Sequence, residues 1–234
     1  MQSKFFASII ISLLLVTSVW AQQPPSWINL GDLPGAYQIR DVLEVPGQNV
    51  IFACGYKDNY WSAIWKTTNG GQNWTNILQG AHVAFVQLKR DSVSGRIWAV
   101  QTTGATSAPI YYTDDLGTYW TPVAGPSSSP ITTAYAIELV GNYLYYGGDI
   151  SNPYYICLYR MHKTTLQWEM VTQYTGCNCI AKLKYSNGKL LVFARDSGGS
   201  KMRVFSHTLS ELDKNAKPIA AAKLEKIVEK SKEK

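Results

Sequence analysis

The stretch Ile64–Leu78 reads IWKTTNGGQNWTNIL and decides how the rest of this chain is interpreted. It places a short aromatic strand before a Gly-Gly turn rich in Thr and Asn, and a Trp opens the strand that follows. Two apolar runs joined by a Gly-containing turn are typical of a β-hairpin. Whether this hairpin is isolated or repeated depends on the sequence around it.

The hairpin is one copy of a repeat. Trp27, Trp74, Trp120 and Trp168 are separated by 47, 46 and 48 residues, and they open the similar phrases SWINL, NWTNI, YWTPV and QWEMV. Strands reading AIWKT, PIYYT and ICLYR precede three of them, and the strand returns as MRVFSH with no Trp after it. A second hairpin lies between successive copies, as in VLEVPGQNVIFACG and IELVGNYLYYGG. A β-sandwich with coincidental Trp spacing does not explain these matching phrases.

Each repeat therefore holds four short strands, and a unit of this length is typical of a β-propeller blade. We predict an all-β fold, a propeller of four-stranded antiparallel blades with strands A to D running outward and the Trp at the start of D. The fourth repeat lacks its D strand, but Trp27–Leu30 is an orphan D strand that would close a four-bladed ring and remove an open edge. A larger propeller shortened at its C-terminus would begin in the same way, so the blade number stays open.

The two ends of the chain differ from the body. Residues 1–21 are predicted to be a secretory signal peptide, because Lys4 precedes the apolar run Phe5–Val16 and Val19-Trp20-Ala21 follows at cleavage spacing. The propeller is assigned to residues 22–213. Residues 214–234 form a basic tail, helical or disordered, with seven Lys and three Glu, which accounts for most of the net charge of +6. The nearly neutral body argues against nucleic-acid binding.

The mature chain is therefore expected to be secreted or otherwise exported, without a membrane span, and monomeric. Cys54, Cys157, Cys177 and Cys179 could form disulfides in that compartment, and we predict that Cys157 pairs with Cys177 or Cys179. Cys177 and Cys179 lack a second ligand pair at metal spacing, so no metal and no cofactor are expected. Asn73 lies in the sequon Asn73-Trp74-Thr75 and is a glycosylation candidate.

The polar turn of the hairpin resembles a known motif. Thr67–Trp74 resembles the Asp-box, or BNR repeat, with the pattern S/T-x-D-x-G-x-x-W, and Thr113–Trp120 matches that pattern in full. The first copy has Asn69 in place of the Asp, and Met161–Trp168 keeps only the Trp. The resemblance extends from Trp27 to about His207 and implies a sialidase-like or sortilin-like propeller. This superfamily includes sialidases, xyloglucan-degrading glycosidases, sortilin-type receptors and photosystem II assembly factors, so it does not imply one function.

The residues of the motif are expected to be structural. An Asp or Asn at the third position accepts hydrogen bonds from the N–H groups of its own turn, and the Gly adopts a backbone conformation closed to residues with a Cβ. The Trp then packs under the turn. This set comprises Thr67, Asn69, Gly71, Trp74, Thr113, Asp115, Gly117 and Trp120.

Function is expected on the opposite face, where the B–C and D–A loops lie and where the resemblance to sialidases implies an active site. Acidic and aromatic side chains around one rim suit a sugar, although solvated loops with ordinary turn residues are the alternative. The ligand-binding candidates are Tyr60, Trp61, Tyr154, Arg195 and Asp196. The catalytic candidates are Arg40, Asp58 and Asp149.

Few residues of this chain match the active site of a glycoside hydrolase. Arg40 stands where the Arg-Ile-Pro motif of sialidases stands, but Asp41-Val42 replaces Ile-Pro, and Glu138 has no identified Tyr partner. Other glycosidases need two carboxylates about 5–10 Å apart. The favoured interpretation is a secreted binding or assembly module for a carbohydrate or an extracellular protein. A sialidase-like glycoside hydrolase and a structural scaffold are the alternatives.

Overall fold

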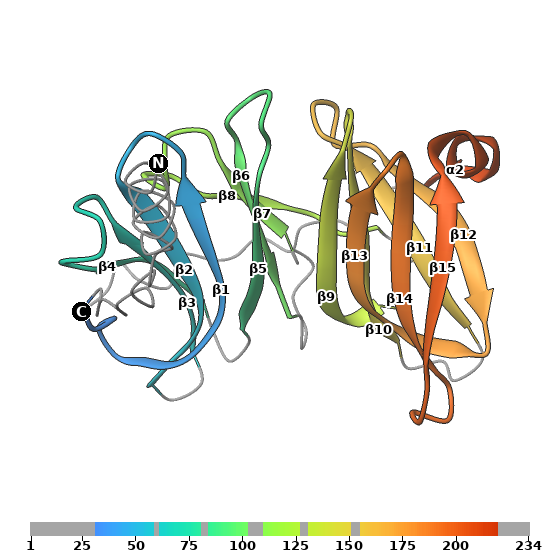
Figure 1. The fold of residues 1–234 in the computed structure, drawn as a ribbon, viewed down its shortest axis with the longest axis horizontal. Coiled ribbons are helices and arrows are strands. Elements are labelled where there is room, and N and C mark those ends of the chain that lie inside the picture. Colours follow the sequence, from blue (N-terminus) through green and yellow to red (C-terminus); the bar gives the residue numbers. More distant parts are fainter. Residues whose placement is uncertain are drawn as a thin grey trace, which may run out of the picture. The chain divides into compact units, whose positions relative to one another are not determined.

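The computed structural model describes residues 31–58, 61–80, 84–102, 110–126, 131–150 and 155–219. The predicted signal peptide and the predicted strand Trp27–Leu30 lie outside the described residues. The described chain is built of antiparallel strands and one short helix, which confirms the all-β prediction (Figure 1). No helix in these ranges is both long enough and apolar enough to cross a membrane.

The strands follow the predicted repeat. Repeat 1 contains β1 (Ala36–Val45), β2 (Val50–Lys57), β3 (Trp61–Thr67) and β4 (Thr75–Gly80), which form one sheet in that order. Repeat 2 forms a second sheet from β5 (Phe85–Arg90), β6 (Ile97–Gln101), β7 (Ile110–Thr113) and β8 (Thr121–Val123). Repeat 3 contains β9 (Ile131–Val140), β10 (Tyr143–Ile150), β11 (Tyr155–His162) and β12 (Trp168–Thr175). Repeat 4 contains β13 (Cys177–Ser186), β14 (Lys189–Asp196) and β15 (Met202–Thr208). Repeats 3 and 4 share a sheet because Asp149 of β10 pairs with Cys179 of β13.

The sheets are held together face to face by apolar clusters, which explains why their middle strands are nearly continuous in hydrophobic residues. Every residue of β6, IWAVQ, is buried. Phe52 and Leu88 meet in the cluster between repeats 1 and 2. The next two clusters contain Trp98 with Ile137, and Tyr145 with Leu183. Stacked sheets with large aromatic side chains between them agree with a propeller architecture.

A β-bulge recurs in the first strand of every repeat. The pairing register skips Arg40, Val86, Tyr135 and Ala181, which are 46, 49 and 46 residues apart. A bulge leaves its extra residue outside the ladder and redirects that side chain.

The bulges bring the first strand very close to the second strand in repeats 1 and 3. A Cβ on Gly55 would lie 1.9 Å from the carbonyl oxygen of Gln38, and a Cβ on Gly148 would lie 2.1 Å from that of Thr133. Only glycine therefore fits at these two positions. The pattern of the sequence does not predict these bulges.

The C-terminal segment differs from its prediction. The helix is α2 (Leu209–Asn215), which begins with a capping box formed by Thr208 and Glu211. Lys217–Ile219, predicted to be helical or disordered, forms strand β16 along the edge of β12. Pro218 explains the change, because Pro disfavours helix in the residue before it and is tolerated on an edge strand. Residues 220–234 lie outside the described ranges.

The predicted disulfide is wrong. All four cysteines are free and buried. Cys157 packs in the cluster between repeats 2 and 3, whereas Cys177 packs in the cluster between repeats 3 and 4. The two thiols therefore belong to different interfaces, and Cys179, the other predicted partner of Cys157, is also a free thiol.

Candidate functional site

Two polar groups lie at opposite ends of the strands. The bulge-end site consists of Tyr135, Asp149, Asn178, Cys179 and Arg195, where the first strands begin and the second strands end. The turn-end pocket lies among the A–B and C–D turns, on the same side as the polar turns that resemble the Asp-box. Each is built from residues of two successive repeats.

Asp149 and Arg195 form the centre of the bulge-end site. They occupy the same position in repeats 3 and 4, since each pairs with the residue two places before a bulge. Arg195 Nη2 lies 3.3 Å from Asp149 Oδ2, and Arg195 Nε donates to Asn178 Oδ1 at 3.4 Å. The side chains stay 41% and 27% exposed, so the pair is open to solvent and to a ligand.

Tyr135 lies beside this pair because it is the bulged residue of β9, and it is 38% exposed. Burial, with a further contribution from the Asp149 charge, raises the pKa of its phenol. Tyr135 is therefore protonated at neutral pH and can donate a hydrogen bond. Burial and the same carboxylate raise the pKa of Cys179 to about 11, so Cys179 is a thiol and a poor nucleophile.

The structure brings together two of the predicted site residues, Asp149 and Arg195, and distributes the others. Asp196 Oδ1 accepts from the N–H groups of Ser200 and Lys201 at 3.0 and 3.1 Å and holds its own loop. Tyr60 and Tyr154 lie outside the described residues.

The remaining candidates belong to repeat 1. Arg40 is the bulged residue of β1, and its guanidinium lies 5.6 Å from the centre of the Tyr56 ring. Asp58 follows β2, and its N–H donates to the carbonyl of Gly35 at 2.9 Å. Trp61 opens β3 and is half-buried. Arg40 and Tyr56 thus occupy in repeat 1 the positions that Tyr135 and Asp149 occupy in repeat 3.

Sequence reasoning missed Tyr135 and Asn178. Tyr135 lies in ITTAYAIELV, which is typical of an ordinary strand. The signal that would have found it is the alignment of the four repeats, because Arg40, Val86, Tyr135 and Ala181 then fall in one column.

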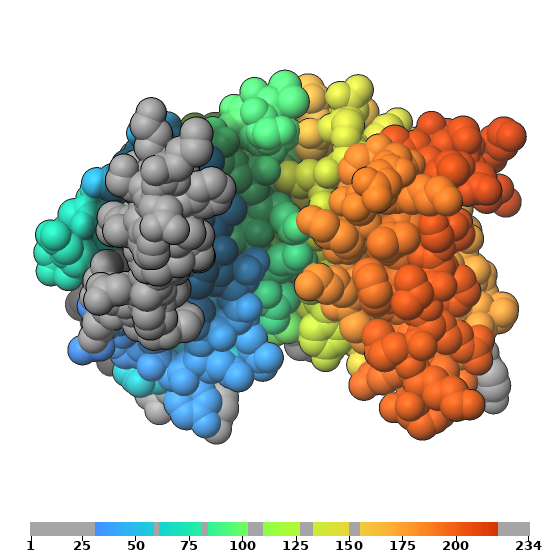
Figure 2. Space-filling view, in the orientation of Figure 1, coloured from blue at the N-terminus to red at the C-terminus, as the bar shows by residue number. Residues whose placement is uncertain are grey.

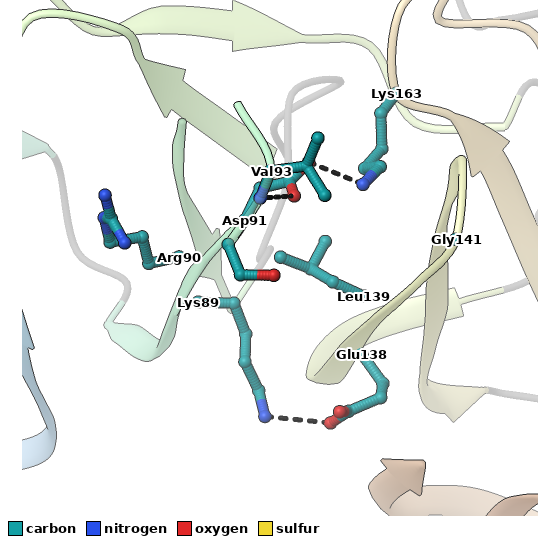
Figure 3. Close-up of a pocket in the computed structure, with 9 residues that line it drawn as sticks. Lys89, Arg90, Asp91, Val93, Glu138, Leu139, Gly141 and Lys163 are labelled. Carbon is teal, nitrogen blue, oxygen red and sulfur yellow. Dashed lines mark hydrogen bonds and ion pairs between the residues drawn. The ribbon is translucent and has the colours of Figure 1, made fainter. Parts of the chain in front are cut away.

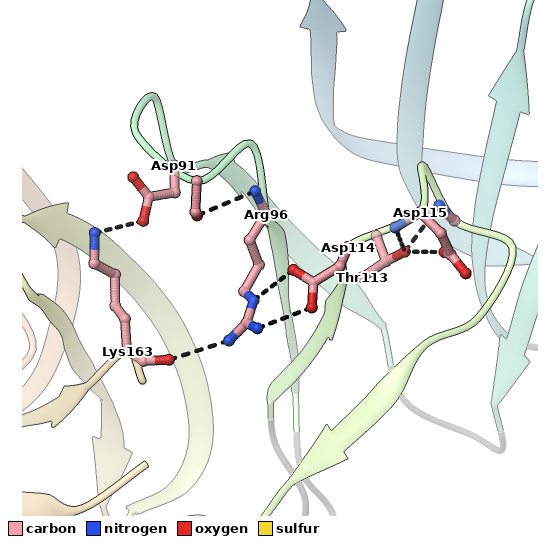
Figure 4. A network of polar contacts seen from close by, with 8 residues as sticks. Asp91, Arg96, Thr113, Asp114, Asp115 and Lys163 are labelled. Carbon is pink, nitrogen blue, oxygen red and sulfur yellow. Dashed lines mark hydrogen bonds and ion pairs between the residues drawn. The ribbon is translucent and has the colours of Figure 1, made fainter. Parts of the chain in front are cut away.

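The polar turns hold themselves together. Thr113 Oγ1 accepts from the N–H of Gly117 at 2.9 Å and donates to Asp115 Oδ1 at 2.7 Å (Figure 4). Asp115 Oδ1 also accepts from the N–H of Tyr119 at 3.0 Å, and these bonds lower the pKa of Asp115.

The turn Thr67–Trp74, the twin of the Thr113–Trp120 turn, makes the same hydrogen bonds with the amide of Asn69 in place of the Asp115 carboxylate. Thr67 Oγ1 accepts from Gly71 N–H at 3.0 Å and donates to Asn69 Oδ1 at 2.8 Å. Asn69 Oδ1 accepts from the N–H of Asn73, the exposed sequon residue, at 3.0 Å. Trp120 packs edge-on against Phe52 of repeat 1, with ring centres 6.5 Å apart, while Trp74 is half-buried at the start of β4.

The turn-end pocket is a cavity of about 290 Å³ between repeats 2 and 3 (Figure 3). Lys89 Nζ pairs with Glu138 Oε2 at 2.8 Å, and Lys163 Nζ pairs with Asp91 Oδ2 at 2.5 Å. Burial opposes ionisation of Asp91, but bonds from Lys163 and from the N–H of Val93 outweigh it and lower the pKa of Asp91. These four charges are matched within the pocket wall and link two repeats.

Arg96 extends this network. It grips Asp114 through Nε and Nη2 at 2.7 and 2.8 Å and donates to the carbonyl of Lys163 at 3.1 Å (Figure 4). Its guanidinium also stacks 3.9 Å from the centre of the Tyr112 ring. The charged side chains at the turn end thus pair with one another and link repeats 2 and 3. Within the described ranges, no group of three or more His, Cys, Asp or Glu side chains is placed to hold a metal ion.

Comparison with known proteins identifies no family for this chain. No family model matches the sequence, and no curated protein matches it. The nidogen/laminin complex is similar at 12% identity with a TM-score of 0.48, covering 68% of this chain and 60% of that one.

Two further structures give similar values. An ancestral GH74 enzyme shows 14% identity and a TM-score of 0.48, with 73% and 27% covered. YCF48 bound to D1 peptide shows 15% identity and a TM-score of 0.48, with 77% and 58% covered. This chain thus spans 60% or less of each of these three proteins. The TM-scores of all three lie below 0.5, so these similarities decide neither the fold nor the function of this chain.

Proposed function

We propose that this chain is an exported binding module of the Asp-box propeller type and that it binds a carbohydrate at the bulge-end site. The observation that supports this is the meeting of Asp149 and Arg195 beside the partly exposed ring of Tyr135. The proposal includes removal of residues 1–21 as a signal peptide and a propeller over residues 22–213. Pairing of Trp27–Leu30 with β15 as the fourth strand of repeat 4 is part of the same proposal.

The chemistry of the site suits a sugar. A tyrosine ring covers an apolar sugar face while its hydroxyl donates or accepts a hydrogen bond. Asp149 accepts hydroxyl hydrogens, and Arg195 donates through several N–H groups. An ion pair as exposed as Asp149–Arg195 contributes little to stability, so the fold does not require it. A ligand that displaces water from the pair would strengthen its own hydrogen bonds to both side chains.

Binding is favoured over hydrolysis. Glycosidases that use two carboxylates place them about 5–10 Å apart across the scissile bond. Among the described residues that make up the bulge-end site, Asp149 is the one carboxylate, and Asp196 is engaged by its own loop. Arg40, the proposed sialidase-like arginine, belongs to repeat 1 and stacks on Tyr56. A sialidase-like site would require groups that these residues do not bring together.

A glycan array probed with residues 22–234 tests the proposal. The wild-type chain should bind a defined subset of glycans, and Tyr135→Leu and Asp149→Asn should each lower that signal at least tenfold. Tyr119→Leu is the matched control, because Tyr119 is 77% exposed on a turn at the other end of the strands. Absence of binding to every glycan, or equal binding by all variants, would refute the proposal. Turnover of a fluorogenic sialoside that Arg40→Ala abolishes would establish the hydrolase instead.

A further inference from the structure

The outer face of repeat 1 is the side of its sheet that points away from repeat 2. It carries apolar side chains like those between the other repeats, but it is exposed. The residue two places after each bulge faces the preceding repeat. At this position Leu88, Ile137 and Leu183 are 3%, 0% and 0% exposed, whereas Val42 is 58% exposed. Val42 therefore occupies a position that is buried in every other repeat, and no sheet formed by the described residues packs against it.

The outer face of repeat 4, which points away from repeat 3, is exposed at a position that is buried in repeats 1 and 2. Ile64, Ile110 and Val204 occupy equivalent positions on β3, β7 and β15, each facing the following repeat. Ile64 and Ile110 are 0% exposed, whereas Val204 is 59% exposed. Phe193 lies directly across from Val204, and Met202 nearby is 54% exposed. Figure 2 shows the residues of repeat 4, in orange and red, facing the viewer uncovered.

Exposed apolar side chains are concentrated on these two faces and their strands. Of the eight large hydrophobic side chains that are exposed in the described part of the chain, five lie on β1 and β15 (Tyr37, Ile39, Val42, Met202 and Val204). Exposed apolar side chains that gather on one face of a protein mark an interaction site.

We propose that a second copy of this chain covers these faces, with the outer face of repeat 4 packed on the outer face of repeat 1 of the partner. The proposal is independent of the carbohydrate site. The contact reproduces the packing that already joins repeats 1 to 2, 2 to 3 and 3 to 4. It is heterologous, because the two faces differ, and two such contacts close a pair of copies. The closed pair would hold eight repeats, which is within the range of known propellers.

The outer face of repeat 4 carries a cationic donor at a position where repeats 1 and 2 carry an acceptor. Between repeats, a side chain just after the bulge bonds to the next first strand: Asp41 Oδ2 accepts from Leu88 N–H, and Gln87 Oε1 accepts from Ile137 N–H, both at 2.8 Å. Lys182 holds this position in repeat 4 and is exposed.

The opposing face supplies the matching charge. Lys182 and Lys184 flank the buried Leu183, so both project from the outer face of repeat 4. Glu44 lies two residues beyond Val42 and projects from the outer face of repeat 1, where it is also exposed. Opposite charges across a heterologous contact favour this partner and this orientation.

Sedimentation velocity on residues 22–234 over a range of concentrations tests the proposal. A dimer in equilibrium with monomer is expected. Val42→Lys, which faces Lys182 of the partner, and Val204→Glu should each raise the dissociation constant at least tenfold. Val93→Glu, at a valine 92% exposed on a turn, is the matched control and should dimerise as wild type. Unchanged thermal unfolding would show that the variants fold, as expected for side chains that are more than half exposed.

Mixing the two variants tests the head-to-tail arrangement. A mixture of Val42→Lys and Val204→Glu keeps one intact contact, so it should form more dimer than either variant alone. If the contact joined identical faces of the two copies, mixing the variants would not increase the amount of dimer. A monomer at every concentration, a dimer unaffected by both variants, or open-ended assembly would overturn the proposal. A monomer that dimerises only after residues 22–30 are deleted would also overturn it, since that segment would then be the occupant.

Discussion

Replacing Thr113 by Val removes one hydroxyl from the Thr113–Trp120 turn and leaves the shape of the side chain nearly unchanged. Thr113 is 2% exposed, and its Oγ1 accepts from Gly117 N–H at 2.9 Å and donates to Asp115 Oδ1 at 2.7 Å. The variant therefore leaves the buried N–H of Gly117 without its acceptor. Since Asp115 is exposed to water, we assign no further cost to the loss of its bond.

The expected loss of unfolding free energy is about 1–3 kcal/mol, the cost of one buried, unsatisfied donor. A domain of 150–250 residues shifts its Tm by about 2–4 °C per kcal/mol, so a loss of about 2 kcal/mol corresponds to about 4–8 °C. Urea unfolding followed by tryptophan fluorescence measures the change. Thr113→Ser keeps the hydroxyl and is the control. Thr67→Val should cost a similar amount, because Thr67 makes the same bonds in the twin turn.

Two results would refute this reasoning. Unfolding of Thr113→Val at the wild-type urea concentration would show that the hydroxyl does not stabilise the turn. Wild-type stability together with loss of glycan binding would place the ligand at the turn end and not at the bulge end.

The remaining predictions concern packing, thiols and pH. Gly148→Ala should lower the unfolding free energy by about 1–3 kcal/mol or more, because its Cβ would lie 2.1 Å from Thr133 O. Gly198→Ala is the control and should be nearly neutral, because the nearest atoms to its Cβ lie at 3.9 Å. Equal stabilities of the two variants would contradict the bulge geometry. An alkylating reagent should label all four buried cysteines only after unfolding, and an intact mass lower by two hydrogens would reveal a disulfide. Burial lowers the pKa of His207 from 6.5, so its stabilising contribution is present above about pH 6.5 and falls as the pH drops through that value. His207→Gln should make the unfolding free energy depend less on pH below about pH 6.5. An unchanged pH dependence would show that His207 is not responsible for it.

The repeat made much of the fold predictable. Three of the four Trp residues of the repeat lie in the described ranges, and each marks the start of a fourth strand: β4 begins directly after Trp74, β8 directly after Trp120, and β12 at Trp168. These positions follow from the sequence because a Trp after a tight turn carries a strong local pattern. The bulges do not follow from it, because a one-residue register shift between two strands leaves their hydrophobic alternation almost unchanged.

The candidate site was predictable only in part. Asp149 and Arg195 were identified from their loops, but their pairing joins residues 46 positions apart on different repeats. Sequence spacing gives no lateral distance between neighbouring sheets. The disulfide prediction failed for the same reason, since it depends on which interface between repeats each cysteine occupies.

The most direct test of the location of the site is calorimetric titration of one array-positive glycan into wild type, Asp149→Asn and Lys89→Gln. Asp149 belongs to the bulge-end site and Lys89 to the turn-end pocket. Binding at the bulge end predicts at least a tenfold weaker affinity for Asp149→Asn, or about 1.4 kcal/mol, and wild-type affinity for Lys89→Gln. Wild-type affinity for Asp149→Asn together with weakened binding by Lys89→Gln would contradict it.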